Sequence, residues 1–490
     1  MRTSSVAALI VSVLMSGSAL AGQPPYGTDA PDIPVSSQDR VYAGEQFSNT
    51  VSVTDPSTNT LLGVISLGQL SPSQLSPLYT GQSLVHGLGF SPDNKTLAVV
   101  SIGSNSVTFI DTQTNEVKHT TYVGRAPHEA FFTQDGSEVW VTVRGEDYVS
   151  VIDATTYEEK ERITVPNGPG MTIFSPDGQY AYVCSSFTPE TSVIDVSSRE
   201  IVGTVPQVSP FCPNIAVTPD GSQVWFTLKD SGKTQVFDGR PPFAMLSTMD
   251  TGPISNHVNI ANNANGTFAY VTIGGLNQVK VINTDNFEEV ATIPTGDLPH
   301  GVWPSGDGTM VYVGLENADE LIAIDTMTNE VVGTVPIGQA PQAVVYVPQA
   351  VTEGDGTANL LPLGITEETN HYLLAGVSAA ADEPVPTNVT LFNQGPSQIL
   401  EASVTGLQEG QSYVLGLADN ADGTGNFEPL AQFMANPAGA AIVNAVGNIQ
   451  EQLDGEGGQN PRFIVIVEGT TDQPGDPVQI QDVTPQDTTD

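Results

Sequence analysis

The chain has 490 residues, and its 55 Asp and Glu outweigh its 14 Lys and Arg to give a formal net charge of −41. Because so few basic side chains cannot neutralise phosphate groups, the composition argues against a nucleic-acid partner and against binding to anionic membranes. The charge favours solubility in a salty or extracellular setting, and the alternative is a surface that attracts cations.

Residues 1–21 have the pattern of a secretory signal peptide. Arg2 precedes an apolar run over residues 6–15, and Ala-Leu-Ala at residues 19–21 forms a small-residue cleavage site. The run is too short to cross a membrane, and no later segment is long enough for a membrane span. We therefore predict an exported protein, periplasmic or extracellular, whose mature chain begins with a linker over residues 22–39.

A strand that ends in Ile-Asp or an equivalent pair recurs along most of the chain, at spacings of 56, 42, 42, 43, 45 and 42 residues. Such periods are typical of propellers and solenoids. In the unit over residues 125–168, four short apolar segments alternate with polar turns, and none has the apolar spacing of a helix. Four antiparallel strands per unit indicate a propeller blade. The repeated position holds Asp55, Asp111, Asp153, Asp195, Asp238, Asn283 and Asp325.

The number of units predicts how the ring closes. Six complete units run from about residue 84 to residue 338, whereas residues 40–68 have only the last three strands of a unit. The missing first strand follows the last unit, at residues 339–350. Pairing it with residues 40–68 completes a seventh blade and leaves no open sheet edge. We predict an all-β fold with a seven-bladed β-propeller over residues 40–351.

Cys184 and Cys212 are the two cysteines of the chain. Cys184 ends the second strand of its blade and Cys212 lies in the loop before the first strand of the next, so both fall on one face of the propeller. In an exported protein this arrangement favours a disulfide. A pair of thiolate metal ligands and two unpaired thiols are the alternatives.

Four of the six histidines fall where the chain enters the innermost strand of a blade, at the mouth of the central channel. They are His86, His128, His257 and His300, and Gln342 holds this place in the first blade; His257 needs a turn one residue longer. Neutral imidazole is a common copper or zinc ligand and also a general base, so the cluster is a candidate metal or catalytic site. The alternative is that the histidines bond neighbouring blades or were duplicated with the repeat.

Further polar residues fall on the same face of the propeller by alignment of the units. In a chain with so few basic residues, two Arg and one Lys on one face suit an anionic ligand. An insertion over residues 69–83 lies just before His86 and is a candidate lid or binding loop, or a decoration of the fold. The candidate ligand contacts are Arg125, Glu129, Arg144 and Gln342, and Lys229 and Glu316 fall on the same face.

The chain changes character after the repeats. A polar hinge over residues 352–357 is followed by short apolar segments over residues 358–470, which predict a smaller β-sandwich-like domain. Residues 438–444 are either a further strand of this domain or a short helix. The tail over residues 471–490, rich in Asp, Gln, Thr and Pro, is predicted to be acidic and disordered.

One loop of the second domain places several oxygen-bearing side chains at short spacing. Asp419, Asp422 and Glu428 are candidate calcium ligands, although the loop lacks the full alternating pattern of a calcium-binding loop. The alternative is a plain turn between strands.

Three stretches carry the repeat most clearly: FSPDGQYAYVCSS…TSVIDVSSREIVGTVP at 174–206, AYVTIGGLNQVKVINTDNFEEVATIPTG at 269–296 and MVYVGLENADELIAIDTMTNEVVGTVPIG at 310–338. In these residues the chain resembles the YVTN-type β-propeller repeat family, over about residues 40–350. The resemblance implies the propeller fold and an exported or surface protein, without implying an activity. Propellers of related architecture include copper-dependent nitrous oxide reductase, the haem d1 domain of nitrite reductases, and some lactonases and lyases. The reaction of nitrous oxide reductase is not implied, because only four blades place a histidine at the channel mouth.

These observations support two hypotheses. The first is an exported, non-enzymatic propeller that binds a protein, a surface polymer or a small ligand through its loops and its channel mouth. The second is a propeller metalloprotein or enzyme, such as a copper-dependent oxidoreductase or a lyase or lactonase, that uses the four histidines. The clustered histidines favour the second hypothesis. The missing nucleophile and acid–base partners favour the first.

Overall fold

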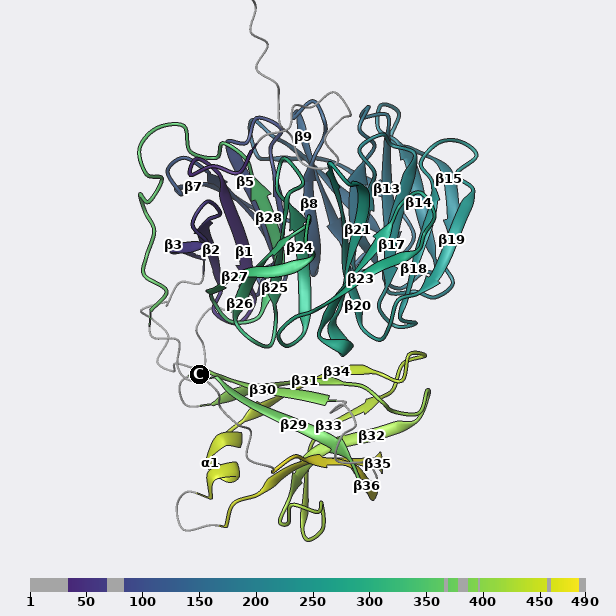
Figure 1. Cartoon of the computed structure of the whole chain (residues 1–490). Helices are drawn as coiled ribbons and strands as arrows, with labels where there is room; N and C mark the ends of the chain where they lie inside the picture. Colours follow the sequence, from purple (N-terminus) through teal and green to yellow (C-terminus); the bar gives the residue numbers. More distant parts are fainter. Residues whose placement is uncertain are drawn as a thin grey trace, which may run out of the picture.

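The computed structural model describes residues 34–67, 83–364, 369–377, 387–394, 397–455 and 460–483. The predicted signal peptide, the linker up to residue 33 and nearly all of the insertion at residues 69–83 lie outside the described residues. The described chain is almost entirely β-strand and forms a propeller with a second β domain below it in Figure 1. The predicted all-β fold class, a seven-bladed propeller followed by a smaller β domain, is confirmed.

Seven four-stranded antiparallel sheets form the blades. From the innermost strand outward, blade one is β28 (Pro341–Val347), β1 (Arg40–Glu45), β2 (Thr50–Asp55) and β3 (Thr60–Ser66). Blade two is β4 (Val85–Phe90), β5 (Thr96–Ser101), β6 (Ser106–Asp111) and β7 (Val117–Tyr122). Blade three is β8 (Pro127–Phe132), β9 (Glu138–Val143), β10 (Tyr148–Asp153) and β11 (Glu159–Thr164). Blade four is β12 (Pro169–Phe174), β13 (Tyr180–Ser185), β14 (Glu190–Asp195) and β15 (Glu200–Pro206).

The remaining three blades follow the same order. Blade five is β16 (Ile215–Val217), β17 (Gln223–Leu228), β18 (Lys233–Asp238) and β19 (Met245–Asp250). Blade six is β20 (Ser255–Asn263), β21 (Gly266–Ile273), β22 (Gln278–Asn283) and β23 (Glu289–Pro294), with the 3-10 helix η2 (Gly274–Leu276) between β21 and β22. Blade seven is β24 (Pro299–Pro304), β25 (Met310–Leu315), β26 (Glu320–Asp325) and β27 (Glu330–Pro336).

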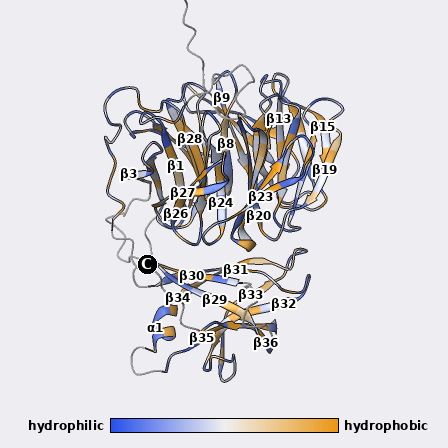
Figure 2. Ribbon diagram, in the orientation of Figure 1, coloured by the Kyte–Doolittle hydropathy of each residue, from blue (hydrophilic) through white to orange (hydrophobic). Residues whose placement is uncertain are grey.

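Packing between blades explains why the inner strands are apolar and the outer strands are not. Every residue of β5 and β9 is buried, whereas the outer strands β7 and β11 expose most of theirs. The large rings of Trp140, Tyr182 and Trp225 are fully buried. Figure 2 shows the same division, with hydrophobic residues concentrated inside the propeller. The core of the propeller therefore lies between the sheets and around the channel.

The ring closes between the two ends of the repeat region. β28 pairs antiparallel with β1, in a register that places Val41 opposite Tyr346 and Ala43 opposite Val344. Arg40 is buried beside this junction and donates to the backbone carbonyl of Asp355. The first blade thus takes its innermost strand from the end of the propeller segment, which is the closure that the sequence predicts.

Aromatic side chains fill the middle of the channel. The rings of Phe90 and Phe131 lie 6.0 and 6.4 Å, between ring centroids, from the ring of Trp303. A cavity of 10 Å³ beside them, lined in part by Met171 and Ile215, is no larger than a single water molecule requires. At this depth the channel therefore leaves little room between the inner strands.

The second domain is one antiparallel sheet of eight strands in the order β33-β32-β35-β36-β29-β30-β31-β34. Each interior strand pairs with both of its neighbours, so the strands form one continuous sheet rather than the two packed sheets of a sandwich. The sheet is nearly closed, because its edge strands β33 and β34 lie next to each other. Its elements are β29 (Asn370–Gly376), β30 (Thr387–Asn393), β31 (Gln398–Val404), β32 (Ser412–Ala418), β33 (Phe427–Met434), β34 (Ala441–Gly447), α1 (Ile449–Asp454), β35 (Phe463–Thr470) and β36 (Gln473–Gln481).

Two expectations for this domain are settled by the strand pairing. The segment at residues 438–444 contributes to a strand, β34, rather than to a helix. The disorder predicted for residues 471–490 is wrong over β36, which pairs with β35 and β29. Its composition is polar, but the backbone of β36 fills a gap between two strands, and this pairing needs few apolar side chains.

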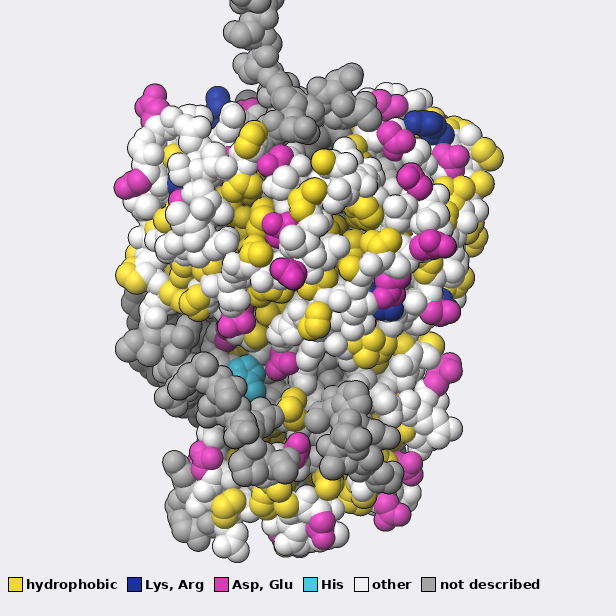
Figure 3. Space-filling model, viewed as in Figure 1, with side chains coloured by type: hydrophobic (Ala, Val, Ile, Leu, Met, Phe, Trp, Pro, Cys, Tyr) yellow, Lys and Arg dark blue, Asp and Glu magenta, His cyan; other side chains and the backbone are white. Residues whose placement is uncertain are grey.

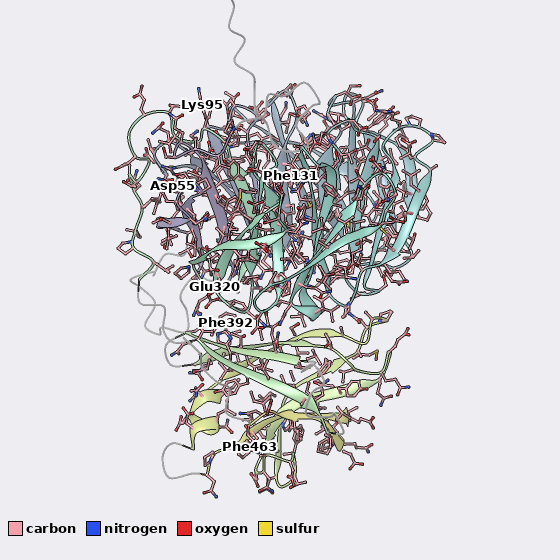
Figure 4. The ribbon with its side chains drawn as sticks, viewed as in Figure 1. Asp55, Lys95, Phe131, Glu320, Phe392 and Phe463 are labelled. Carbon is pink, nitrogen blue, oxygen red and sulfur yellow. A yellow bond between two sulfur atoms is a disulfide. The ribbon has the colours of Figure 1, made fainter. Side chains whose placement is uncertain are left out.

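The second domain packs against one face of the propeller. Phe392 of β30 contacts Phe47, with the two ring centroids 4.9 Å apart. Asn388 donates to the carboxylate of Asp297 at 3.1 Å, and Thr390 of the same strand also faces the propeller. Figure 4 shows Phe392 on the side of the second domain that faces the propeller. These propeller residues lie in loops before innermost strands and in hairpins after second strands, which form the face that carries the channel mouth.

Within the described residues, no helix is both long enough and apolar enough to cross a membrane.

Candidate functional site at the channel mouth

A β-bulge at the start of an innermost strand positions each of the four histidines. In β4, β8 and β24, two residues lie opposite one residue of the neighbouring strand, and the first of the two is His86, His128 or His300. In β20 the first bulge residue is Asn256, and His257 is the second. The alignment that gave His257 the same position as the others is therefore wrong by one residue, because Asn256 occupies that position. A bulge redirects side chains locally, which turns these residues toward the channel mouth.

The four imidazole rings lie together and are buried. Their exposed fractions are between 3% and 8%. The ring centroids are 4.4 Å apart for His86 and His128, 4.7 Å for His257 and His300, and 6.3 Å for His86 and His300. The structure thus brings together the four residues selected from the sequence, as two close pairs side by side.

The first pair is joined by a hydrogen bond between ring nitrogens. The Nε2 atoms of His86 and His128 are 2.9 Å apart, so one ring donates and the other accepts. The Nδ1 atoms of both rings are buried and have no hydrogen-bond partner among the described residues. Because a neutral imidazole has one donor and one acceptor, this pair leaves one of each unsatisfied.

Burial keeps these histidines neutral. It lowers the pKa of His86 to about 3, with a smaller contribution from the charges of His300 and Arg144. Burial also lowers the pKa values of His128 and His257 well below their ordinary value. For His300 burial again lowers the pKa, although Glu316 opposes the effect.

A carboxylate of the propeller anchors the second pair. Glu316 accepts from Nδ1 of His300 at 2.6 Å and from the side-chain amide of Gln342 at 2.6 Å. Burial acts to raise the pKa of Glu316, but His300, Lys229 and Gln342 together outweigh it and hold the pKa low. Glu316 is therefore ionised, and it fixes the orientation of His300.

A second carboxyl group comes from the other domain. Glu401 of β31 is buried, accepts from the side-chain amide of Asn444 at 2.8 Å and lies beside the carboxyl group of Glu316. Burial, together with the charge of Glu316 and a hydrogen bond to it, raises the pKa of Glu401 well above its usual range. Glu401 therefore favours its neutral form more strongly than Glu316 does. The repeat pattern gave no signal for Glu401, because this residue lies outside the repeats.

Three charged residues share one position in the blades of the propeller. Arg144, Lys229 and Glu316 each directly follow the second strand of a blade, after β9, β17 and β25. The guanidinium carbon of Arg144 is 4.6 Å from the ring centroid of Phe211 and 5.7 Å from that of Phe187. The ammonium nitrogen of Lys229 is 6.0 Å from the same Phe211 ring. Phe211 links the two cations and was not selected from the sequence.

The other proposed ligand contacts have different surroundings. The side chain of Arg125 is 73% exposed and pairs with Glu146 at 3.8 Å. Glu129 is buried, and burial raises its pKa well above its usual range. A Cβ atom at Gly87 would lie 2.5 Å from a Glu129 oxygen, which explains why glycine occupies that position. Arg125 is therefore a surface side chain, and Glu129 packs against the neighbouring blade.

Cys184 and Cys212 form a disulfide, so neither thiol is available as a metal ligand. The bond links the end of the second strand of blade four to the loop before β16. The backbone amide of Cys212 also donates to the carbonyl of Ser185 at 3.0 Å. The loop that carries Phe211 is consequently fixed to the neighbouring blade by covalent and hydrogen bonds.

The arrangement of candidate metal ligands can be compared with the predictions in the described part of the chain. There, no three or more His, Cys, Asp or Glu side chains are placed to hold a metal ion as they stand. In the candidate calcium loop, Asp422 accepts from Thr424 at 2.6 Å, and Arg462 contacts both Asp419 and Glu428. A guanidinium group thus takes the place that a cation would occupy between those two carboxylates.

The fold defines this protein as a seven-bladed β-propeller with a second β domain over its channel mouth. No protein-family model matches the chain, and no curated protein matches it. Among solved structures, the chain is similar to Kuenenia stuttgartiensis hydrazine synthase, with a TM-score of 0.51 and 22% identity over 58% of this chain and 94% of that one.

A second similar structure is a functionally unknown protein from Desulfotomaculum acetoxidans DSM 771. Its TM-score is 0.51 at 15% identity, and the match covers 62% of this chain and 98% of that one. At these identities both likenesses show the propeller fold alone.

Proposed function

We propose that this chain is an exported binding or scaffold protein, built from YVTN-type repeats, that holds its partner on the uncovered part of the mouth face. The proposal rests on the observation that the second domain covers only part of the mouth face of the propeller. Its contacts fall on loops of blades five, six, seven and one, through residues such as Asp230, Asp297 and Phe47. We call these loops the covered half.

The loops of blades three and four remain accessible beside it. Phe187 and Val208 are 53% and 55% exposed there. Together with Arg144 and Phe211 they define what we call the open sector. Exposed aromatic and aliphatic side chains beside a stacked arginine are the composition expected of a contact surface.

The chemistry of the mouth supports binding rather than catalysis. The four histidines are neutral and buried, and His300 is engaged by Glu316. Both thiols of the chain are joined in the disulfide. Below the mouth, the ring of Trp303 lies among those of Phe90 and Phe131 in the channel. A substrate would therefore have to reach the histidines past the second domain.

Export is supported by the signal-peptide pattern of residues 1–21 and by the disulfide, a bond that persists in oxidising compartments. The YVTN assignment is supported by the repeat residues at 174–206, 269–296 and 310–338, which build blades four, six and seven. The partner is a protein, a surface polymer or a small ligand.

Site-specific crosslinking tests this function. A photo-reactive phenylalanine replaces Phe187 in the open sector of the full chain, and in a control protein it replaces Tyr122, which is 74% exposed on β7. After irradiation in the cells that produce the protein, we expect a discrete adduct from position 187 and none from position 122. Equal labelling at both positions, or none at either, would remove the open sector as the binding surface.

A metalloprotein is the second candidate, and one observation favours it. The four histidine rings lie at centroid distances between 4.4 and 6.3 Å, and Nε2 of His257 is buried without a partner among the described residues. A small movement of the rings would therefore give copper or zinc several imidazole ligands. Copper would bring oxidoreductase chemistry, and zinc would bring hydrolase, lyase or lactonase chemistry.

Metal analysis of the mature protein tests this candidate against the His128→Ala/His300→Ala double variant. Stoichiometric copper or zinc that disappears in the variant would support it. A protein that binds neither metal, and whose thermal stability is unchanged when either is added, would eliminate it.

A further inference from the structure

We infer that Arg144 and Lys229, which both lie within about 6 Å of the Phe211 ring centroid, form a binding site for a small oxyanion of the carboxylate, phosphate or sulfate class. This inference rests on the proposed function, because it names the chemistry recognised at the edge of the open sector, where Arg144 of blade three meets Lys229 of blade five. Of the three basic residues predicted on the mouth face, the site uses Arg144 and Lys229 but not Arg125.

The basic residues of this chain are few, and most have an acidic partner. Of the 14 Lys and Arg, 13 lie within the described residues. Eight of these have a carboxylate oxygen within 4 Å: Lys118, Arg125, Lys160, Arg162, Arg199, Lys233, Lys280 and Arg462.

The remaining five differ in what they contact. Arg40 and Arg240 donate to backbone carbonyls, and Lys95 is exposed. Arg144 and Lys229 contact the Phe211 ring instead and, among the described residues, have no carboxylate within ion-pair distance. In a protein with a net charge of −41, two adjacent cations that lack such a partner are unexpected. Their position at the channel mouth makes a bound anion the natural counter-charge.

The guanidinium of Arg144 is already held in place. It lies between the rings of Phe211 and Phe187, which restrict its side chain without using its N–H donors. Its Nε atom is buried and has no acceptor among the described residues. Because a buried donor without an acceptor is unfavourable, an oxyanion at the edge of the guanidinium would satisfy it.

The platform beneath the two cations is rigid. The backbone amide of Phe211 donates to the carbonyl of Ser186, and the carbonyl of Phe211 accepts from the amide of Lys229. Phe211 directly precedes Cys212, which the disulfide ties to Cys184 of blade four. The ring that both cations contact is thus fixed between blades four and five before any ligand binds, which lowers the entropic cost of binding.

The neighbouring groups favour an anion of low charge. The histidines beside Arg144 are neutral, and the Nδ1 atoms of His86 and His128 have no partner among the described residues. Glu316, Glu401 and Asp230 act electrostatically on Lys229 from a longer range. These three acidic groups limit the excess positive charge, so that a singly charged group suits the site better than a polyanion.

Thermal unfolding of the full chain tests the inference. Sodium phosphate, sodium sulfate and sodium acetate are each titrated at constant ionic strength, with sodium chloride making up the difference. We expect at least one oxyanion to raise the Tm saturably, by about 2 °C at ten times its dissociation constant. The gain should disappear in Arg144→Gln and in Lys229→Gln, and Arg144→Lys should retain part of it because the charge remains while the planar fork is lost.

Arg240→Gln is the matched control, because Arg240 follows β18 in a loop on the opposite face of the propeller. The Arg240→Gln variant should show the same oxyanion-dependent rise in Tm as the wild-type protein. Sulfate and phosphate also stabilise proteins by exclusion from the surface, so an equal rise in Tm for every variant would overturn the site. The absence of any saturable rise would overturn it as well. An adduct at position 187 together with a failed titration rejects the anion alone, whereas failure of both rejects the proposed function too.

Discussion

The covered half and the open sector of the mouth face are built from the same repeated loops, yet they carry different side chains. Asp230 and Asp319 contact the second domain in the covered half, whereas the open sector has Arg144, Phe187 and Phe211. In the side view of Figure 3, acidic side chains are scattered over both domains and basic side chains are few. The repeat fixes where a side chain is placed, and the second domain determines which of these places remain available for a partner.

Loss of the contact between Phe392 and Phe47 should loosen the second domain and make the covered half more like the open sector. Phe392 is fully buried against Phe47, so Phe392→Ala should cost about 3–5 kcal/mol and loosen the second domain. We expect faster hydrogen exchange in the covered half, for example at Asn317, with little change at Phe211. Phe463→Ala is the control, because Phe463 begins β35 on the side of the second domain away from the propeller (Figure 4).

If Phe463→Ala exposed the amides of the covered half as much as Phe392→Ala does, the exchange would report general unfolding of the second domain. The separate docking role of Phe392 would then be wrong.

Removal of the disulfide should instead loosen the open sector and leave the covered half unchanged. Its two cysteines are 28 residues apart, and loss of such a cross-link costs about 3–4 kcal/mol by loop entropy. Cys184→Ser/Cys212→Ser should therefore lower the unfolding temperature and increase hydrogen exchange at Phe211 and Lys229, with Asn317 unaffected. Wild-type protein reduced with dithiothreitol should match the variant. An unfolding temperature equal to that of the oxidised wild-type protein would contradict this assignment.

The repeat made the propeller predictable in detail. A strand that ends in Ile-Asp every 42 to 45 residues gave the blades, and the incomplete unit at residues 40–68 required the partner that β28 provides. The same alignment placed His86, His128 and His300 at one structural position. It failed at His257, because Asn256 takes the first place of the bulge in β20 and His257 takes the second.

What lies outside the repeat had no such guide. Glu401 reaches the mouth from β31 of the second domain, and only the packing of the two domains shows it. Phe211 was not selected because an aromatic residue in a loop has no distinctive pattern. The polar segment that forms β36 was assigned to a disordered tail, because its strand pairing depends on the backbone rather than on composition.

The smallest expected effect compares a histidine of the channel mouth with a carboxyl group of the covered half by the pH dependence of stability. Burial lowers the folded pKa of His86 to about 3, so the unfolded chain takes up a proton first as the pH falls. Its contribution to stability is therefore complete above pH 6.5 and is lost as the pH falls toward 3, which amounts to about 0.7 kcal/mol between pH 7 and pH 6. His86→Gln should reduce the loss measured by urea unfolding by this amount. In the covered half, burial raises the pKa of Asp319 to about 6, so its contribution is lost as the pH rises instead. Asp319→Asn should therefore change the pH dependence with the opposite sign, and a shift of the same sign in both variants would contradict the opposite pKa shifts of His86 and Asp319.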